Sequence, residues 1–167
     1  MALASHVSVV PNHITGRIVP LKFRFDVAMS AKLGMDLQPK DMTPEDKEFS
    51  KNAIKDYYSI RSIVQFGDLY RLLSPYENKR TAMMYVTEDQ NDAVLFTYLL
   101  KKSINGNTQP LILEGLDPDK NYRVTELNKE TKGYSWFTPL DGKVFSGDYL
   151  MKYGPVSYTH MTLPTIR

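Results

Sequence analysis

Two histidines, a serine and an asparagine lie close together near the amino end of this 167-residue chain. Two of them stand in a valine-rich run, and the other two follow Pro11, where a loop begins. Their imidazole, hydroxyl and amide groups can all donate and accept hydrogen bonds. Loops after the carboxyl ends of parallel strands form the active-site rim of α/β enzymes. The candidates for contact with a substrate are therefore His6, Ser8, Asn12 and His13.

Other chemistry finds less support in this sequence. The alternative is that His6 and Ser8 are satisfied by backbone groups and only shape the rim. A metal site on His6 and His13 would need a third ligand at suitable geometry. For Arg17 and Arg24 we expect pairing with carboxylates of neighbouring elements. The chain has no cysteine, which excludes a thiol nucleophile and cysteine metal sites. It has no Walker loop, dinucleotide fingerprint or hydrolase elbow, so we expect no metal and no cofactor.

The elements around the candidates alternate between strand and helix. Residues 2–10 are rich in β-branched side chains and end at a proline, which predicts a mostly buried strand. Residues 11–20 supply a loop. Residues 21–27 alternate apolar and charged side chains as a strand would, but their apolar residues, continued into 28–32, also recur at helical spacing. Residues 33–37 are short and apolar and predict a second buried strand.

The clearest predicted element is a helix over residues 44–64. Thr43 is a natural N-cap, Pro44 suits the first helical position, and two acidic residues follow at the positive end of the dipole. Gly67 is expected to end the helix in the left-handed conformation. The resulting β-α-β-α order indicates a parallel sheet. The inner face of the helix is an apolar stripe at spacings of three and four: Phe49, Ala53, Tyr57, Ile60 and Val64.

After Gly67 the pattern changes to short β-type runs joined by polar turns. Closely spaced short strands of this kind predict an antiparallel sandwich or barrel. We place a domain boundary here, with an α/β part over residues 1–66 and an all-β part over residues 67–155. The runs expected to form strands are 69–73, 82–86, 93–100, 111–113 and 122–127.

Composition limits the classes of function. The 21 basic and 19 acidic residues give a net charge of +2, which is too balanced for a nucleic-acid-binding protein. No apolar run approaches the roughly 20 residues needed to span a membrane. We therefore expect neither nucleic acid nor membrane as a partner, and the sequence does not define a compartment.

Several stretches together resemble glycoside hydrolase family 36, the bacterial-type α-galactosidases. They are HVS…PNH…TGR…PL…R…VA within residues 6–28, then GDLYRLLSPYE, YVTEDQNDAVLF, GLDPDKNYRV and SGDYLM. The resemblance implies that residues 1–66 are the last two β-α units of a (β/α)8 barrel. Residues 67–155 are then the small antiparallel β-sandwich that follows the barrel. The resemblance also favours the helix over the strand for residues 21–32.

The resemblance implies a retaining enzyme that hydrolyses terminal α-linked galactose, with α-galactoside oligosaccharides as its ligands. Retaining glycosidases use two carboxylates about 5–5.5 Å apart. In the family both are aspartates, in motifs of the type Lys-Trp-Asp and Ser-Asp-x-x-Asp, and neither motif occurs here. No catalytic residue can be assigned, and we expect this chain alone to be inactive. Whether the parent enzyme forms a homo-oligomer is left open.

Two other classes of protein are considered. One is a carbohydrate-binding or structural accessory module built on the β part, without catalysis. Residues 2–64 count against it, because two parallel β-α units leave most of a barrel absent. The other is an enzyme of a different barrel family with a β-sandwich appendage, which only the specific motifs exclude.

Two features of the β part suggest ligands. Tyr134, Trp136 and Phe137 could form a platform for a sugar ring, although an aromatic cluster of this kind is commonly a satellite core. Residues 88–92 and 117–119 are acidic enough to suggest calcium. Neither has the spaced ligands and glycine of a dedicated calcium loop, so we interpret both as turns.

Residues 156–167 have no counterpart in the family. They resemble the translation of a transposase sequencing adapter, and we interpret them as a non-native tail. The alternative is a genuine flexible tail. We expect this segment to pack against nothing.

Overall fold

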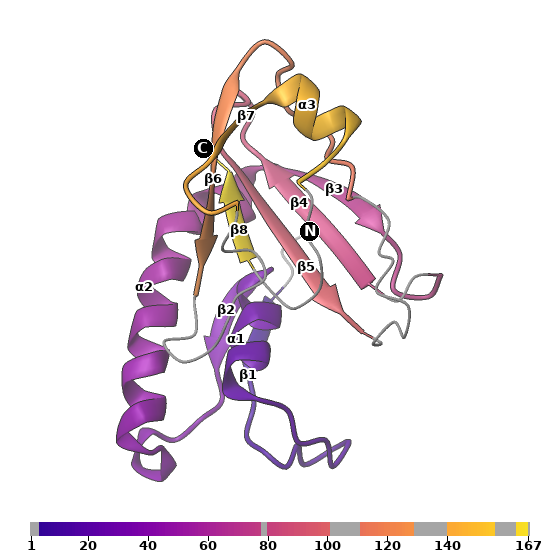
Figure 1. The fold of residues 1–167 in the computed structure, drawn as a ribbon. Coiled ribbons are helices and arrows are strands. Elements are labelled where there is room, and N and C mark those ends of the chain that lie inside the picture. Colours follow the sequence, from indigo (N-terminus) through magenta and orange to yellow (C-terminus); the bar gives the residue numbers. More distant parts are fainter. Residues whose placement is uncertain (1–3, 78–79, 101–110, 129–139, 156–162, 167) are drawn as a thin grey trace. The chain divides into compact units, whose positions relative to one another are not determined.

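The computed structural model describes residues 4–77, 80–100, 111–128, 140–155 and 163–166. The chain divides into two compact units, Met1–Gln65 and Phe66–Arg167, here called unit 1 and unit 2. Figure 1 labels the helices and strands of both. Among the described residues, no helix combines the length and apolar character that crossing a membrane requires.

Unit 1 has the predicted β-α-β-α order, and its two strands pair in parallel. The helix interpretation of residues 21–29 is confirmed. In the parallel pair, Ala4 lies opposite Lys32 and Val7 lies opposite Met35. The elements are β1 (Ala4–Val7), α1 (Leu21–Met29), β2 (Lys32–Met35), the short 3-10 helix η1 (Pro39–Asp41) and α2 (Pro44–Phe66).

Helix α1 forms although its sequence alternates like a strand. Helical spacing places Phe25, Ala28 and Met29 in the core, with none of them more than 1% exposed. The Phe25 ring meets Phe49 of α2 edge to face, with centroids 5.9 Å apart. Asp26 is also buried, and its carboxylate pairs with the Lys22 ammonium at 2.6 Å. Tertiary packing therefore decided between two patterns that the sequence left open.

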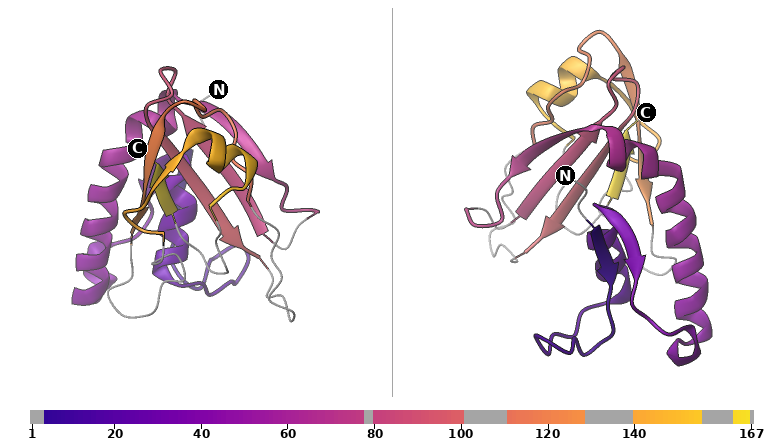
Figure 2. Two further views of the ribbon diagram at one scale, coloured as in Figure 1. Left: turned by 45° about the horizontal axis from the view of Figure 1, so that its top comes forward. Right: turned by 180° about the vertical axis from the view of Figure 1, so that it is seen from behind.

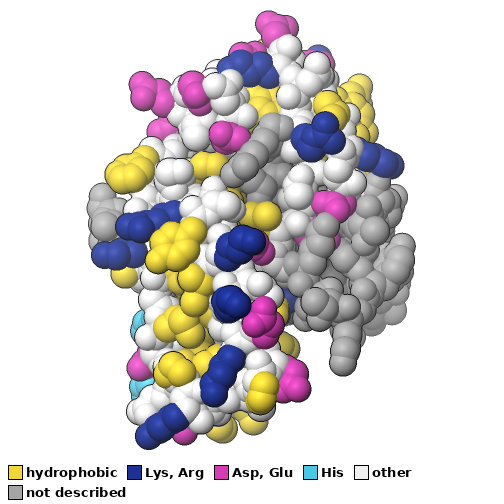
Figure 3. All heavy atoms as spheres, turned by 90° about the vertical axis from the view of Figure 1, so that its left-hand side faces the viewer, with side chains coloured by type: hydrophobic (Ala, Val, Ile, Leu, Met, Phe, Trp, Pro, Cys, Tyr) yellow, Lys and Arg dark blue, Asp and Glu magenta, His cyan; other side chains and the backbone are white. Residues whose placement is uncertain are grey.

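Helix α2 begins and packs as its sequence indicates. The Thr43 hydroxyl accepts a hydrogen bond from the Asp46 amide at 3.1 Å, which caps the helix. The predicted stripe is buried except at Phe49, which is half-buried. Figure 3 shows Lys and Arg side chains in a column along the outer face of α2. Gly67 follows the helix but is not in the left-handed region, so that detail of the prediction is wrong.

The two strands of unit 1 are less buried than predicted. Val7 is the one fully buried residue of β1, and Val9, just beyond it, is 39% exposed. Strand β2 has no fully buried residue, and Met35 at its end is 39% exposed. A parallel strand is buried when helices cover both faces of its sheet. In unit 1, as described, the sheet consists of these two strands alone.

Unit 2 is built on one antiparallel sheet with the strand order β3-β4-β5-β8-β6-β7. The sheet is visibly twisted, as expected for antiparallel strands (Figure 2). The antiparallel character was predicted, but the described strands form one sheet and not the two packed layers of a sandwich. Its strands are β3 (Asp68–Leu73), β4 (Arg80–Val86), β5 (Ala93–Leu99), β6 (Asn121–Leu127), β7 (Val144–Ser146) and β8 (Leu163–Ile166).

The core of unit 2 combines strand residues with one short helix, α3 (Gly147–Lys152). Ser146 caps α3 by accepting a bond from the Tyr149 amide at 3.2 Å, and Leu150 is fully buried. Leu111 and Leu113 are buried in the same core. They were predicted as a strand, which is wrong: the Leu113 amide donates to the Leu150 carbonyl at 3.3 Å, so this segment pairs with a helix turn and not with a strand.

The expectation that the tail packs against nothing is wrong for residues 163–166. They form β8, which pairs antiparallel with β5 on one side and β6 on the other. Edge strands expose unpaired backbone groups that will accept another strand. Whether the tail is native is a separate question, on which the prediction stands untested.

Candidate functional site

Asn12 organises the loop that follows β1. Its side-chain carbonyl accepts hydrogen bonds from the Ile14 amide at 3.1 Å and from the Thr15 amide and hydroxyl at 2.9 and 3.1 Å. Its own backbone carbonyl accepts from the Gly16 amide at 2.7 Å, and Gly16 has a φ of 66°. An asparagine that bonds the backbone two and three residues ahead is a turn-forming device. Asn12 therefore fixes the shape of residues 12–17.

The same asparagine is tied to Ser8, and Ser8 is tied to α1. The Asn12 amide donates to the Ser8 hydroxyl at 3.2 Å, and the guanidinium of Arg24 donates to the Ser8 carbonyl. Burial lowers the pKa of Arg24, and the Asp46 carboxylate partly opposes that effect. The Arg24 Nε atom is buried without a hydrogen-bond partner in the described structure. Arg24 thus binds a backbone carbonyl, where a carboxylate was expected.

The two histidines do not join this network. His6 lies on β1 opposite Gly34 of β2, and His13 lies in the loop. Both side chains are exposed. The described residues contain no group of three His, Asp or Glu side chains that could hold a metal ion. Imidazole groups at an exposed strand end are free to donate or accept a hydrogen bond.

The four predicted rim residues therefore divide into two pairs. Ser8 and Asn12 bond to each other and hold the loop, while His6 on β1 and His13 in the loop are exposed. Thr15 was not among the predicted residues, although an asparagine with a threonine three residues later is a known turn signal. The bond from Arg24 spans 16 residues of sequence, so no local pattern could indicate it.

A hollow of unit 1 lies between β2 and α2. It has a volume of about 300 Å³ and is lined on the strand side by Gly34 and Met35, and on the helix side by Ile54, Tyr58 and Arg61. Tyr58 is 66% exposed. No pair of carboxylates lines this hollow.

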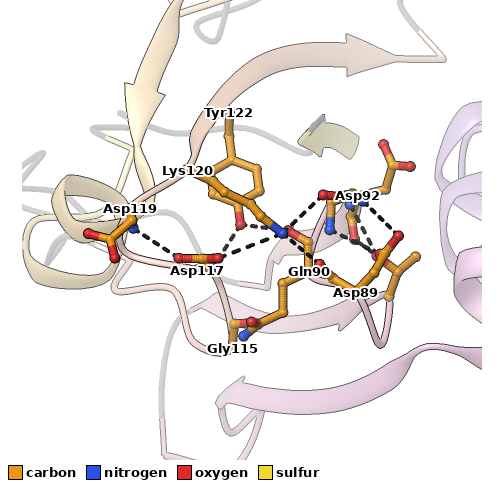
Figure 4. Close-up of polar contacts among 10 residues, drawn as sticks. Asp89, Gln90, Asp92, Gly115, Asp117, Asp119, Lys120 and Tyr122 are labelled. Atoms are coloured by element: carbon orange, nitrogen blue, oxygen red, sulfur yellow. Dashed lines mark hydrogen bonds and ion pairs between the residues drawn. The ribbon is translucent and has the colours of Figure 1, made fainter.

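A cluster of polar contacts joins two loops of unit 2 (Figure 4). The Lys120 ammonium donates to the Asp89 carbonyl at 2.7 Å and to the Asn91 side-chain oxygen at 3.0 Å, and lies 3.6 Å from the Asp117 carboxylate. The Thr87 hydroxyl, then the Asn91 amide, lower the pKa of Asp89 through hydrogen bonds to its carboxylate, and the Lys120 charge adds to this. The two acidic segments considered for calcium thus enclose an ammonium group.

Tyr122 and Gln90 complete this cluster. The Tyr122 hydroxyl donates to the Gln90 carbonyl at 2.7 Å and accepts from the Asp117 amide at 2.9 Å. The Gln90 side chain donates to the Gly115 carbonyl at 2.9 Å. These bonds fasten the β4–β5 turn to the segment before β6. We interpret the cluster as a structural tie between two loops.

The remaining sequence candidates do not form an active site in the described residues. Asp26 is buried in its ion pair on α1, and Asp36 and Asp41 are exposed. Tyr134, Trp136 and Phe137, the possible sugar platform, lie outside the described residues.

Two family models match the chain in succession. Residues 1–67 match the model described as Melibiase, and residues 80–156 match the model described as glycosyl hydrolase family 36 C-terminal domain. The first match falls on unit 1 and the second on unit 2.

Individual relatives agree with these matches. The chain is 35% identical over 153 residues to α-galactosidase AgaA of Geobacillus stearothermophilus, covering 92% of this chain and 19% of the relative. The crystal structure of α-galactosidase AgaB from the same organism overlays with a TM-score of 0.81 at 33% identity, covering 97% of this chain and 21% of that one. A variant of AgaA in complex with raffinose overlays with a TM-score of 0.78 at 32% identity, covering 97% and 21%. The chain thus spans about a fifth of the length of the relatives it matches.

Proposed function

Because the chain belongs to glycoside hydrolase family 36, we propose that it is the carboxyl-terminal part of a retaining α-galactosidase. The parent enzyme would release terminal α-linked galactose from oligosaccharides. One solved relative was crystallised with raffinose, which is an oligosaccharide of this class.

The observation that carries the proposal is the order of the two family matches. A Melibiase match over residues 1–67 is followed along the chain by a C-terminal-domain match over residues 80–156. An accessory carbohydrate-binding module built on the β part would not be expected to include the Melibiase match over residues 1–67. The matched relatives are named as α-galactosidases, so the accessory-module alternative is not favoured.

Within that enzyme, unit 1 would supply the last two β-α units of a (β/α)8 barrel. The parallel pairing of β1 with β2 and the alternation with α1 and α2 support this assignment. Barrel enzymes bind substrate at the carboxyl ends of their strands. The loop held by Asn12 follows the carboxyl end of β1 and would lie on that rim.

We assign different roles to the rim residues. Asn12 and Ser8 are already engaged in bonds within the loop, so they would position it. His6 and His13 have exposed side chains that could reach a hydroxyl of the sugar or of the next residue in the oligosaccharide. The two catalytic carboxylates would come from parts of the enzyme outside these residues.

Assay of the complete gene product on aryl α- and β-galactosides tests the proposal. We expect hydrolysis of the α-linked substrate alone, and NMR of the first-formed sugar should show the α-anomer, since two displacements retain the configuration. Activity restricted to β-linked or non-galactose substrates would refute the assignment. Release of the β-anomer would leave the substrate class intact and refute retention.

A further inference from the structure

We propose that the space between β5 and β6 is a strand-binding slot that selects its occupant through main-chain hydrogen bonds, and that residues 163–166 of this chain fill it. The occupant is the chain's own carboxyl-terminal segment. This inference concerns the assembly of unit 2 and does not depend on the proposed activity.

Strand β8 lies between β5 and β6 and pairs with both. Leu163 to Ile166 pair with Leu127 to Val124 on one side, and Thr165 and Ile166 also pair with Val94 and Ala93 on the other. Residues 93–98 of β5 are all buried. A buried strand needs hydrogen-bond partners along both edges, because an unpaired buried backbone group is costly. The pairing with β4 occupies one edge of β5, and β8 is the described strand on the other.

Hydrogen bonds on the other edge of β6 show which of its backbone groups face β8. The Val124 amide donates to the Lys143 carbonyl at 2.9 Å, and the Glu126 amide donates to the Asp141 side chain at 2.9 Å, so both point away from β8. Backbone groups alternate in direction along a strand. The N–H and C=O groups of Thr125 and Leu127 therefore point into the slot. Their partners by register are Thr165 and Leu163.

The ladder between β8 and β5 is short, with pairs only at Ala93–Ile166 and Val94–Thr165. The same alternation turns the backbone groups of residues 164 and 166 toward β5. The register would next place Pro164 opposite Leu95, but the ladder ends at Val94. Proline has no N–H to donate, so the pairing stops where the donor is missing. Main-chain chemistry thus accounts for the length of the ladder.

Amide hydrogen exchange of the full chain and three variants tests the proposal. In Thr165→Pro the donor toward β6 is lost, and exchange at Thr125 and Leu127 should accelerate by about tenfold relative to Val124. Thr165→Val keeps the amide and the β-branched shape, and should leave exchange unchanged. In Pro164→Val the new amide faces the Leu95 carbonyl and should itself be protected.

Several results would overturn the proposal. Equal exchange at Thr125 in Thr165→Pro and the unchanged chain would mean that β8 does not fill the slot. Accelerated exchange in Thr165→Val would mean that the side chain, and not the main chain, is selected. If protection of the Thr125 amide from exchange decreases when the protein is diluted, the strand in the slot comes from a second copy of the chain. If Thr165→Pro does not fold, an unprotected amide at residue 164 in Pro164→Val refutes the proposal by itself.

Discussion

The hydroxyl of Tyr122 donates a hydrogen bond to the backbone carbonyl of Gln90, 2.7 Å away. The two residues are 32 positions apart in sequence, and Tyr122 is 1% exposed. The same hydroxyl accepts a bond from the Asp117 amide at 2.9 Å. One oxygen atom on β6 therefore holds the β4–β5 turn and the loop before β6 together.

Removing this hydroxyl should destabilise unit 2. Tyr122→Phe leaves the Gln90 carbonyl and the Asp117 amide without their partner, which costs roughly 1–3 kcal/mol when such groups are buried. Urea unfolding followed by circular dichroism measures the loss. Tyr153→Phe is the matched control, because Tyr153 is 61% exposed. Equal unfolding midpoints for the two variants would contradict the structural role of the hydroxyl.

The stability of the chain should also fall at alkaline pH in a way that depends on Tyr122. Burial raises the pKa of Tyr122, and the charges of Asp117 and Asp89 add to this, while the Asp117 amide opposes it. A raised pKa in the folded state means stabilisation that is complete below the unfolded value of about 10 and is lost as the pH rises through the folded value.

Ultraviolet absorbance of tyrosinate is measured against pH for the unchanged chain and for Tyr122→Phe. The difference between the two curves is the titration of Tyr122. We expect the difference curve to have its midpoint above about pH 10. A midpoint at or below about pH 10, the value of an exposed tyrosine, would show that the Tyr122 hydroxyl is not buried.

Gly154 should be far less replaceable than Gly142. Both have positive φ, 69° and 78°, so alanine is strained at either position. A Cβ at Gly154 would lie 1.9 Å from the Leu111 carbonyl oxygen, whereas a Cβ at Gly142 meets nothing within 4 Å. Gly142→Ala should cost about 1 kcal/mol and Gly154→Ala clearly more. Equal decreases in the unfolding midpoints of Gly142→Ala and Gly154→Ala would show that the backbone near Leu111 can shift to accommodate the new Cβ at little cost.

Asn12 should control the order of the loop formed by residues 12–17. Asn12→Ala removes the acceptor of three hydrogen bonds and the donor to Ser8. Thermolysin should then cut before Ile14, which is 82% exposed, severalfold faster than in the unchanged chain. Asn52→Ala, on the exposed face of α2, serves as the control. An unchanged rate of cleavage at Ile14 would mean that the loop keeps its shape without the asparagine.

The chain by itself should not hydrolyse an aryl α-galactoside. It lacks both carboxylate motifs, and loss of even one carboxylate normally abolishes covalent turnover. The assay is release of the aryl group at the highest soluble concentration, against a buffer blank and the complete enzyme. Turnover by this chain that an α-galactosidase inhibitor suppresses would show that a catalytic pair has been overlooked.

Local patterns in the sequence determined much of this protein. The N-cap at Thr43 and the apolar stripe that follows specify α2, because helix periodicity and capping depend on neighbours within four residues. The strands β3, β4, β5 and β6 were predicted nearly to the residue from short β-type runs between polar turns. The residues HVS and PNH also marked the loop after β1, whose turn chemistry is local to Asn12.

Only the tertiary structure decided the features that depend on distant partners. Residues 21–27 carried both a strand and a helix pattern, and burial of Phe25 against Phe49 selected the helix. Leu111 and Leu113 looked like a strand, but they meet a turn of α3. Residues 163–166 form a strand between β5 and β6, although no local pattern predicted a strand there. In each case the deciding free energy comes from contacts between segments far apart in sequence, which no short window of residues contains.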